Sequence, residues 1–105
     1  MIQVVSVFNF DTAKRSLEEW ERYYTGEYVH ALRKAPGLAR YIVGKTMKMG
    51  HADTAYSRVA TLFYEDLAAF QRASSSPEGR EAGRMMREMA PDSKLYVVAA
   101  EEVEP

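Results

Sequence analysis

The stretch Ile2-Gln3-Val4-Val5-Ser6-Val7-Phe8 decides the fold. It is rich in β-branched residues and too short for a buried helix, so it predicts a β-strand. Both faces of this strand are largely apolar, which is typical of a strand whose sheet is covered on both sides. The rest of the chain must therefore supply a cover for each face.

A helix is predicted next. Ser16-Leu17-Glu18-Glu19 fits a capping box, in which Ser16 accepts a hydrogen bond from the Glu19 amide while the Glu19 side chain reaches back. Apolar residues then recur at helical spacing until Pro36-Gly37, where the helix should end. The members of this stripe are Leu17, Trp20, Tyr24, Tyr28, Ala31 and Ala35.

Two further strands are predicted over Arg40 to Lys48 and Tyr56 to Tyr64, and a last strand over Lys94 to Val103. Between the last two lies a pair of helices. Asp66 should cap the first of them, and Ser76-Pro77 should begin the second.

Apolar residues indicate which sides of these two helices are buried. Leu67 and Phe70 are expected to point inward from the first. The second carries Ala82, Met85, Met86 and Met89 along one face, as the i, i+3, i+4, i+7 spacing requires.

The order of elements is the βαββαβ pattern of a ferredoxin-like α+β sandwich, a four-stranded antiparallel sheet with helices on one face. We expect residues 1–105 to form a single domain of this kind. The helices cover only one face, yet Ile2 to Phe8 and Leu95 to Ala99 are apolar on both. Because a bare apolar sheet is a liability in water, we expect a homodimer in which two sheets pack face to face as a dimeric α+β barrel.

Composition excludes several classes of protein. The chain has no cysteine, which excludes disulfides and thiolate metal sites, and its net charge of −1 gives no support for a nucleic-acid partner. No apolar run approaches the roughly 20 residues that span a bilayer, and no signal-peptide pattern precedes the first strand. We therefore expect a cytoplasmic protein that binds neither nucleic acid nor membrane.

Several stretches resemble the EthD family of small dimeric α+β-barrel proteins, and together they cover nearly the whole chain. They are Ser16-Leu17-Glu18-Glu19-Trp20, Tyr23-Tyr24, Pro36-Gly37-Leu38-Ala39-Arg40-Tyr41, Leu62-Phe63-Tyr64-Glu65-Asp66-Leu67-Ala68-Ala69-Phe70 and Ser76-Pro77-Glu78-Gly79. The resemblance implies the same fold and the same dimer. It implies no single reaction, because related barrels include cofactor-free monooxygenases, dehydratases, lactone isomerases and haem-degrading enzymes.

Many EthD relatives carry a histidine late in the first helix, and counting back from Pro36 that position falls on Tyr28. His30 is displaced by two residues, about 200° around a regular helix, so it does not simply replace that histidine. Either the helix geometry differs locally or a phenol stands at the acid–base position. Tyr28 is then a hydrogen-bond donor in a pocket or a core tyrosine, and His30 an acid–base group or a surface histidine.

The candidate catalytic residues are Tyr28, His30 and Tyr24. The candidate substrate-binding residues are Trp20, Tyr41, Tyr64, Met85 and Met89. Each of these could instead be ordinary core. Tyr64 and Arg58 share a strand face by alternation, and the sequence leaves open whether that face meets the helices or a second subunit.

No metal site and no cofactor are predicted. His51 with Asp53 offers too few ligands for a metal, and no glycine-rich phosphate motif exists. A haem binder is a weak alternative, because only His30 and His51 could supply an imidazole.

Two hypotheses for function remain. The first is a cofactor-independent oxygenase, dehydratase or isomerase that binds a small apolar or aromatic metabolite between helices and sheet. The alternative is a non-catalytic binding or accessory protein. A cavity of about 300 Å³ or more with converging polar groups would favour ligand chemistry.

Overall fold

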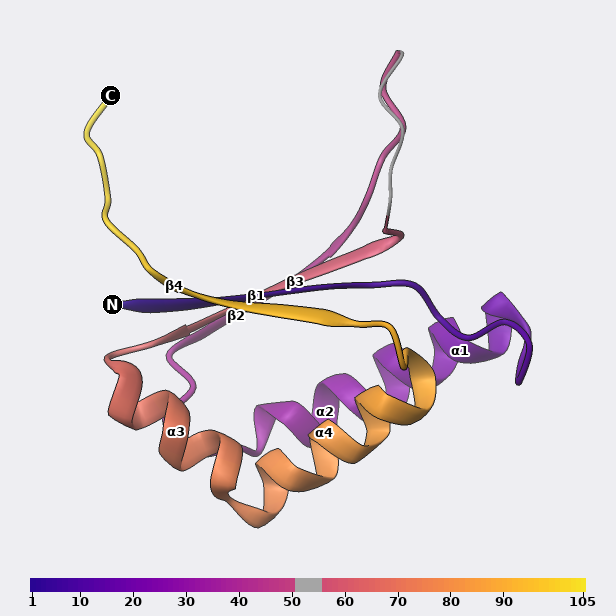
Figure 1. The fold of residues 1–105 in the computed structure, drawn as a ribbon, viewed down its shortest axis with the longest axis horizontal. Coiled ribbons are helices and arrows are strands. Elements are labelled where there is room, and N and C mark those ends of the chain that lie inside the picture. The colour runs from indigo at the N-terminus through magenta and orange to yellow at the C-terminus, as the bar shows by residue number, and fades with distance from the viewer. Residues whose placement is uncertain (51–55) are drawn as a thin grey trace.

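The computed structural model describes residues 1–50 and 56–105. Four strands form one antiparallel sheet in the order β2-β3-β1-β4, and all the helices lie on one face of it (Figure 1). This arrangement confirms the predicted α+β sandwich. In chain order the elements are β1 (Ile2–Phe8), α1 (Leu17–Tyr23), the π-helical turn η1 (Tyr24–Tyr28), α2 (Val29–Arg33), β2 (Arg40–Lys45), β3 (Arg58–Tyr64), α3 (Leu67–Ser75), α4 (Pro77–Met89) and β4 (Lys94–Ala99).

Strand β1 lies inside the sheet, hydrogen-bonded to β3 along one edge and to β4 along the other. Its alternate residues Val4, Ser6 and Phe8 are buried toward the helices. The register places Tyr64 and Arg58 of β3 opposite Ile2 and Phe8, on this same face. The sequence did not decide whether the face with Tyr64 and Arg58 meets the helices or a second subunit. In the structure it meets the helices.

The first helix begins as predicted but does not continue as a regular α-helix. The Ser16 hydroxyl accepts a hydrogen bond from the Glu19 amide at 3.2 Å and donates to the Glu19 carboxylate at 3.1 Å. At η1 the pattern changes, and the Val29 N–H donates to the Tyr24 carbonyl, five residues back. The expectation of one regular α-helix is therefore corrected, but the apolar stripe is largely confirmed, because Trp20, Tyr24, Tyr28 and Ala35 are all buried.

The predicted caps of the later helices are confirmed. Asp66 accepts from the Ala69 amide at 2.8 Å, and Ser76 accepts from the Gly79 amide at 3.0 Å with Pro77 in the first turn. A side chain at Gly79 would overlap the Ala73 carbonyl oxygen, so α3 and α4 approach too closely there for any residue but glycine.

Two residues expected to point inward are exposed. Leu17 and Leu67 are 50% and 48% exposed, and each is the first residue of its helix. A side chain at that position lies beyond the packed turn, so helical spacing overstates its burial. Ala69 and Ala73 are the buried residues of α3.

The buried side chains form two clusters of different character. The first, called the aromatic core, lies under α1, η1 and α4 and consists of Phe8, Phe10, Trp20, Tyr24, Tyr28, Ala82, Met85, Met89 and Ala90. The second, called the alanine-rich cluster, consists of Val4, Ala35, Ala60, Leu62, Tyr64, Ala69 and Ala73. Large rings fill the aromatic core, whereas small side chains leave space in the alanine-rich cluster.

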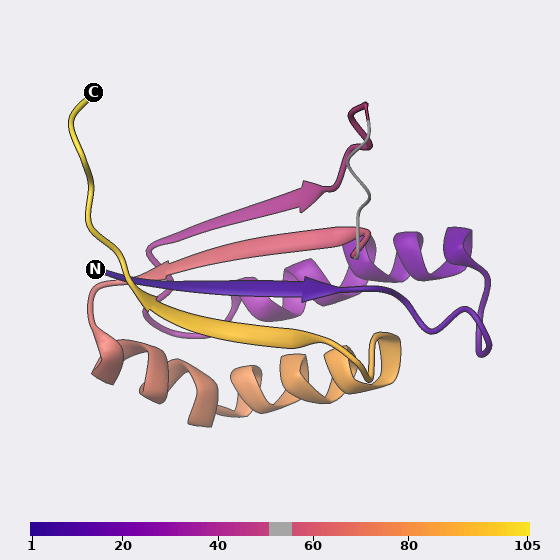
Figure 2. The same ribbon diagram turned by 45° about the horizontal axis from the view of Figure 1, so that its top comes forward.

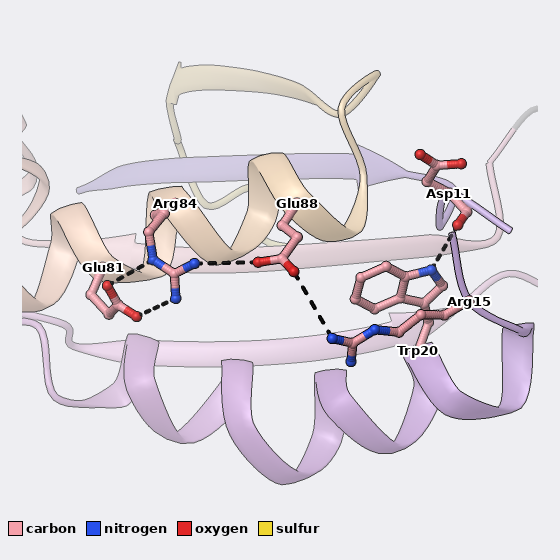
Figure 3. A network of polar contacts seen from close by, with 6 residues as sticks. All are labelled: Asp11, Arg15, Trp20, Glu81, Arg84 and Glu88. Carbon is pink, nitrogen blue, oxygen red and sulfur yellow. Dashed lines mark hydrogen bonds and ion pairs between the residues drawn. The ribbon is translucent and has the colours of Figure 1, made fainter. Parts of the chain in front are cut away.

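A network of polar contacts joins α4 to the segment before α1 (Figure 3). The Trp20 indole N–H donates to the Asp11 carbonyl at 2.8 Å, and the Arg15 guanidinium lies 4.7 Å from the centre of the Trp20 ring. Arg15 also contacts Glu88 of α4 at 3.9 Å. Exposed pairs of this kind contribute about 1 kcal/mol or less each, so the network orients α4 more than it stabilises the fold.

The face of the sheet away from the helices, called the open face, has apolar residues on every strand together with the polar residues Gln3, Arg40, Thr61 and Lys94. It carries Val5 and Val7 of β1 together with Ile42, Tyr96 and Val98, the last three between 41% and 53% exposed. Strands β2 and β4 are shorter than predicted and end at Lys45 and Ala99. No helix within the described residues is long and apolar enough to cross a membrane.

Candidate functional site

A pocket of about 560 Å³ lies between the sheet and the helices. Its floor is formed by residues of β1 and β3, namely Val4, Ser6, Ala60, Leu62 and Tyr64. The opposite wall comes from Tyr28, Leu32, Ala35, Phe70, Ala73, Ala82 and Met86. The pocket exists because the alanine-rich cluster places small side chains where sheet and helices face each other.

The mouth of the pocket lies on the side of the sheet where β4 is the edge strand. The exposed residues of the lining are Ser74 at the end of α3, Arg80 and Arg87 on α4, and Leu95 on β4. Figure 2 shows α4 running beneath β4 along this side. A ligand would enter between these two elements.

Three hydroxyl groups belong to the buried part of the lining, those of Ser6, Tyr28 and Tyr64. Within residues 1–50 and 56–105 none of these hydroxyls makes a hydrogen bond to another protein group. Burial raises the pKa of the Tyr28 phenol well above its ordinary value of 10.0, and the neighbouring Tyr24 and Tyr64 add to the effect. The pKa of Tyr64 is raised by burial as well. Both phenols are therefore protonated near neutral pH and can donate hydrogen bonds to a ligand.

The π-helical turn η1 determines where Tyr28 lies. It begins at Tyr24 and ends at Tyr28, and the two rings stack with centroids 5.5 Å apart and planes at 15°. Tyr24 is fully buried in the aromatic core, while Tyr28 reaches the pocket lining. The turn thus carries the chain from the filled part of the interior to the hollow part.

A buried polar group lies behind Tyr28. Arg58 forms an ion pair with Glu21, and its guanidinium lies 5.0 Å from the centre of the Tyr24 ring. The hydroxyls of Tyr24 and Tyr41 influence each other but form no hydrogen bond of ordinary geometry, and both are buried. Burial raises the pKa of Tyr41 far above its ordinary value, with Tyr24 and Tyr28 contributing next.

The model of the EthD domain family matches residues 14–97 of the chain. The chain belongs to the EthD family. No curated protein matches it.

Solved structures show the same fold. An EthD family protein from Bacillus halodurans is 18% identical, with a TM-score of 0.84 over 98% of this chain and 99% of that one. SnoaB, a cofactor-independent oxygenase from Streptomyces nogalater, is 19% identical, with a TM-score of 0.69 over 99% and 96%. A dimeric ferredoxin-like protein of unknown function from Thermobifida fusca is 18% identical, with a TM-score of 0.68 over 94% and 90%.

Of the residues predicted for the site, the EthD fold brings Tyr28 and Tyr64 together in the pocket lining. Tyr24 and Tyr41 lie one layer behind them, in contact with the same cluster of phenols. His30 is exposed on α2 and is not part of the described pocket lining. The roles of these residues in catalysis or binding stay predictions.

Trp20, Met85 and Met89 lie in the aromatic core and not on the pocket. The sequence predicts Trp20 beside a ligand because it shares a helical stripe with Tyr28, and the two methionines because they belong to a deformable apolar face of another helix. The residues of α4 that line the pocket lie on a neighbouring side of that helix and include Met86. None of these three residues belongs to the described pocket lining, so their role in binding a ligand stays a prediction. His51 lies outside the described residues.

Sequence reasoning overlooked Ser6, Arg80 and Arg87. A signal for Ser6 was present, because it shares a strand face with Val4 and Phe8, and a lone hydroxyl on such a face needs a partner. The two arginines gave no signal, since charged residues on an exposed helix face are ordinary.

The described lining of the pocket contains no carboxylate, imidazole or thiolate group. Among residues 1–50 and 56–105, no three or more such side chains are placed so that they could hold a metal ion. What this part of the chain offers a ligand is an apolar wall, three hydroxyls and, at the mouth, two guanidinium groups.

The raised pKa of Tyr41 predicts a loss of stability at high pH. In the unfolded chain the phenol ionises near 10.0, whereas in the fold it stays protonated to higher pH. Stability conferred by this group is therefore complete below pH 10.0 and declines as pH rises above it, by up to about 1.4 kcal/mol per pH unit. Replacing the unpartnered hydroxyl in Tyr41→Phe should leave the fold intact and flatten this decline. Urea unfolding at fixed protein concentration across this range measures it, and equal slopes for both proteins would contradict the assignment.

Proposed function

We propose that the protein binds a small, largely apolar metabolite in the pocket between sheet and helices. The observation that carries this proposal is a cavity of about 560 Å³ whose lining includes three hydroxyls that have no described protein partner. Ligand sites are commonly apolar cavities of this size with a few placed polar groups. The hydroxyl oxygens of Ser6, Tyr28 and Tyr64 are not among the fully enclosed polar atoms, so they are accessible and can hydrogen-bond a guest.

The pocket favours ligands that carry a carbonyl or another acceptor oxygen. Tyr28 and Tyr64 are protonated donors, so they can polarise a ligand carbonyl and weaken the adjacent C–H bonds. Such polarisation would assist a cofactor-independent oxygenase, a dehydratase or an isomerase. The similarity to SnoaB, a cofactor-independent oxygenase, supports chemistry of this class.

One observation favours a second candidate, a non-catalytic binding or accessory protein. The described lining contains no side chain that is basic at neutral pH and able to accept a proton from a ligand. Two donors and an apolar wall are sufficient for binding alone. Turnover of a bound metabolite would distinguish an enzyme from a carrier.

Filling the pocket should abolish ligand binding. Ala60 lies on the floor and is 3% exposed, so Ala60→Phe places a ring in the space that a ligand would occupy. With the neutral fluorescent probe N-phenyl-1-naphthylamine, we expect wild type to bind and Ala60→Phe to bind at least about tenfold more weakly, a change of about 1.4 kcal/mol.

Ala68→Phe is the matched control, because Ala68 lies on the exposed side of α3 outside the pocket lining. It should bind the probe as wild type does. Circular dichroism establishes that each variant is folded, and Ala60→Leu replaces Ala60→Phe if the larger ring prevents folding. Equal affinity of wild type and a folded pocket-filling variant would refute binding in this pocket.

Tyr28→Phe tests the hydrogen bond separately from the cavity. The phenol makes no described hydrogen bond within the protein, so its loss should change the thermal midpoint little. Binding of 6-propionyl-2-dimethylaminonaphthalene, a fluorescent ketone, should weaken by about 0.5–1.5 kcal/mol, as expected for one neutral hydrogen bond. If the variant binds the ketone as tightly as wild type does, Tyr28 is only a core tyrosine.

The open face of the sheet supports a homodimer. We infer that two copies pack sheet to sheet, because the face carries apolar residues that are exposed on β2 and β4 and half-buried on β1, and a structural neighbour is described as dimeric. Contact between two such faces removes both from water. The helices and the pocket then lie on the outer sides of the resulting barrel.

Val5→Lys should dissociate this dimer. Val5 is on the central strand of the open face, so a lysine there is solvated in a monomer and buried without a partner in the dimer. Light scattering should report twice the chain mass for wild type and about one chain mass for the variant. Leu67→Lys, on the exposed surface of α3, should remain dimeric. A monomeric wild type, or a dimeric Val5→Lys protein, would contradict the interface.

A further inference from the structure

We propose that the ligand carries one anionic group, such as a carboxylate, which Arg80 and Arg87 bind at the mouth of the pocket while the apolar part of the ligand lies inside. This inference rests on the proposed binding function and adds the chemical class of the ligand. Its basis is the arrangement of charge around the pocket mouth.

Arg80 and Arg87 lie on the same side of α4, seven residues and about 10 Å of helix axis apart. Gly83 lies between them and also lines the pocket. A guanidinium nitrogen of Arg87 lies 3.4 Å from the position that a Cβ atom of Gly83 would occupy. The Arg87 side chain therefore folds back along α4 toward Arg80, over a residue that has no side chain of its own.

The other side of α4 shows what these arginines lack. Arg84 forms ion pairs with Glu81 at 2.6 Å and with Glu88 at 3.2 Å, and Figure 3 shows both carboxylates turned toward it. Within residues 1–50 and 56–105, Arg80 and Arg87 have no carboxylate partner. The same helix thus neutralises the cation that faces away from the pocket and leaves free the two that line it.

The surroundings of the mouth suit an oxyanion. The described lining includes two guanidinium groups and no carboxylate, so its local charge is positive although the whole chain carries −1. Ser74, which is also exposed at the mouth, and Ser93 add two more hydroxyls to the lining. An arginine fork binds a carboxylate or a similar planar anion through paired hydrogen bonds, which gives orientation as well as attraction.

The residues deeper in the pocket indicate the chemistry of the remaining part of the ligand. Behind the arginines the wall is formed by apolar residues such as Leu32, Leu62 and Phe70. A ligand with a ring system inside and a carboxylate at the mouth satisfies both regions. The buried hydroxyls of Tyr28 and Tyr64 then contact the end of the ligand farthest from the anion.

A matched pair of probes tests the anion separately from the cavity. N-phenyl-1-naphthylamine is neutral, and 8-anilinonaphthalene-1-sulfonate is the same ring system with one sulfonate. Titrations at low and high salt use wild type, Arg80→Gln, Arg87→Gln and the double variant. Arg72→Gln, an exposed arginine of α3 outside the lining, controls for net charge, and Ala60→Phe controls for binding in the pocket.

We expect the sulfonate to bind wild type more tightly than the neutral probe does, and the advantage to shrink at high salt. Each single variant should weaken sulfonate binding about threefold and the double variant about tenfold, in line with partly exposed ion pairs, with neutral-probe binding unchanged. Arg72→Gln should have no effect.

The anion site is overturned if wild type binds the two probes with equal affinity, or if Arg72→Gln and Arg80→Gln lose equal affinity for the sulfonate probe. In either case the proposed binding function stands as long as Ala60→Phe still blocks the neutral probe. If Ala60→Phe affects neither probe, the binding function itself fails and the anion site fails with it. Circular dichroism and thermal midpoints of the arginine variants distinguish a lost site from a lost fold.

Discussion

The structure depends on the central position of β1. This strand is hydrogen-bonded along both edges, to β3 and to β4, and both of its faces carry apolar residues, so each face needs a cover. Its helix-facing residues Val4, Ser6 and Phe8 set the level on which the helices pack. Its opposite face has no cover in the single chain. The seven residues of β1 therefore determine both where the helical layer packs and which apolar surface is left uncovered in the single chain.

A contrast in side-chain size runs along the layer between sheet and helices. At the Phe8 end, rings and methionines fill the space, with Phe8, Phe10 and Tyr24 in mutual ring contact. At the other end, alanines from β3, α3 and the end of the first helical segment leave it open. The solid end holds the elements in place, so the hollow end can persist without collapsing. Close approach of α3 and α4 at Gly79 fixes the outer wall of that space.

Most of the fold was predictable because its signals are local. Caps at Ser16, Asp66 and Ser76 mark helix starts through side chains a few residues from the amides they bind. Short runs rich in β-branched residues located the strands in the same local way. The lining of the pocket was harder to predict, because an alanine in a helix or strand is read as core whether or not its neighbours fill the space beside it. The location of Met86 on the pocket and Met85 in the core follows from the tertiary position of α4 and not from spacing along it.

The π-helical turn at Tyr24–Tyr28 has a consequence for how the chain tolerates insertions and deletions. A π turn contains one residue more than an α turn, so it acts as an insertion that the helix has absorbed without breaking. Removing one residue there would restore a continuous α-helix while the segments on either side keep their faces, because the wide turn has already absorbed the extra residue. Trp20 and Leu32 would both keep their places. Alignments of relatives across this segment must therefore allow a gap inside a helix, because counting back from Pro36 to Tyr28 stays on one side of that gap, whereas counting on to Trp20 crosses it.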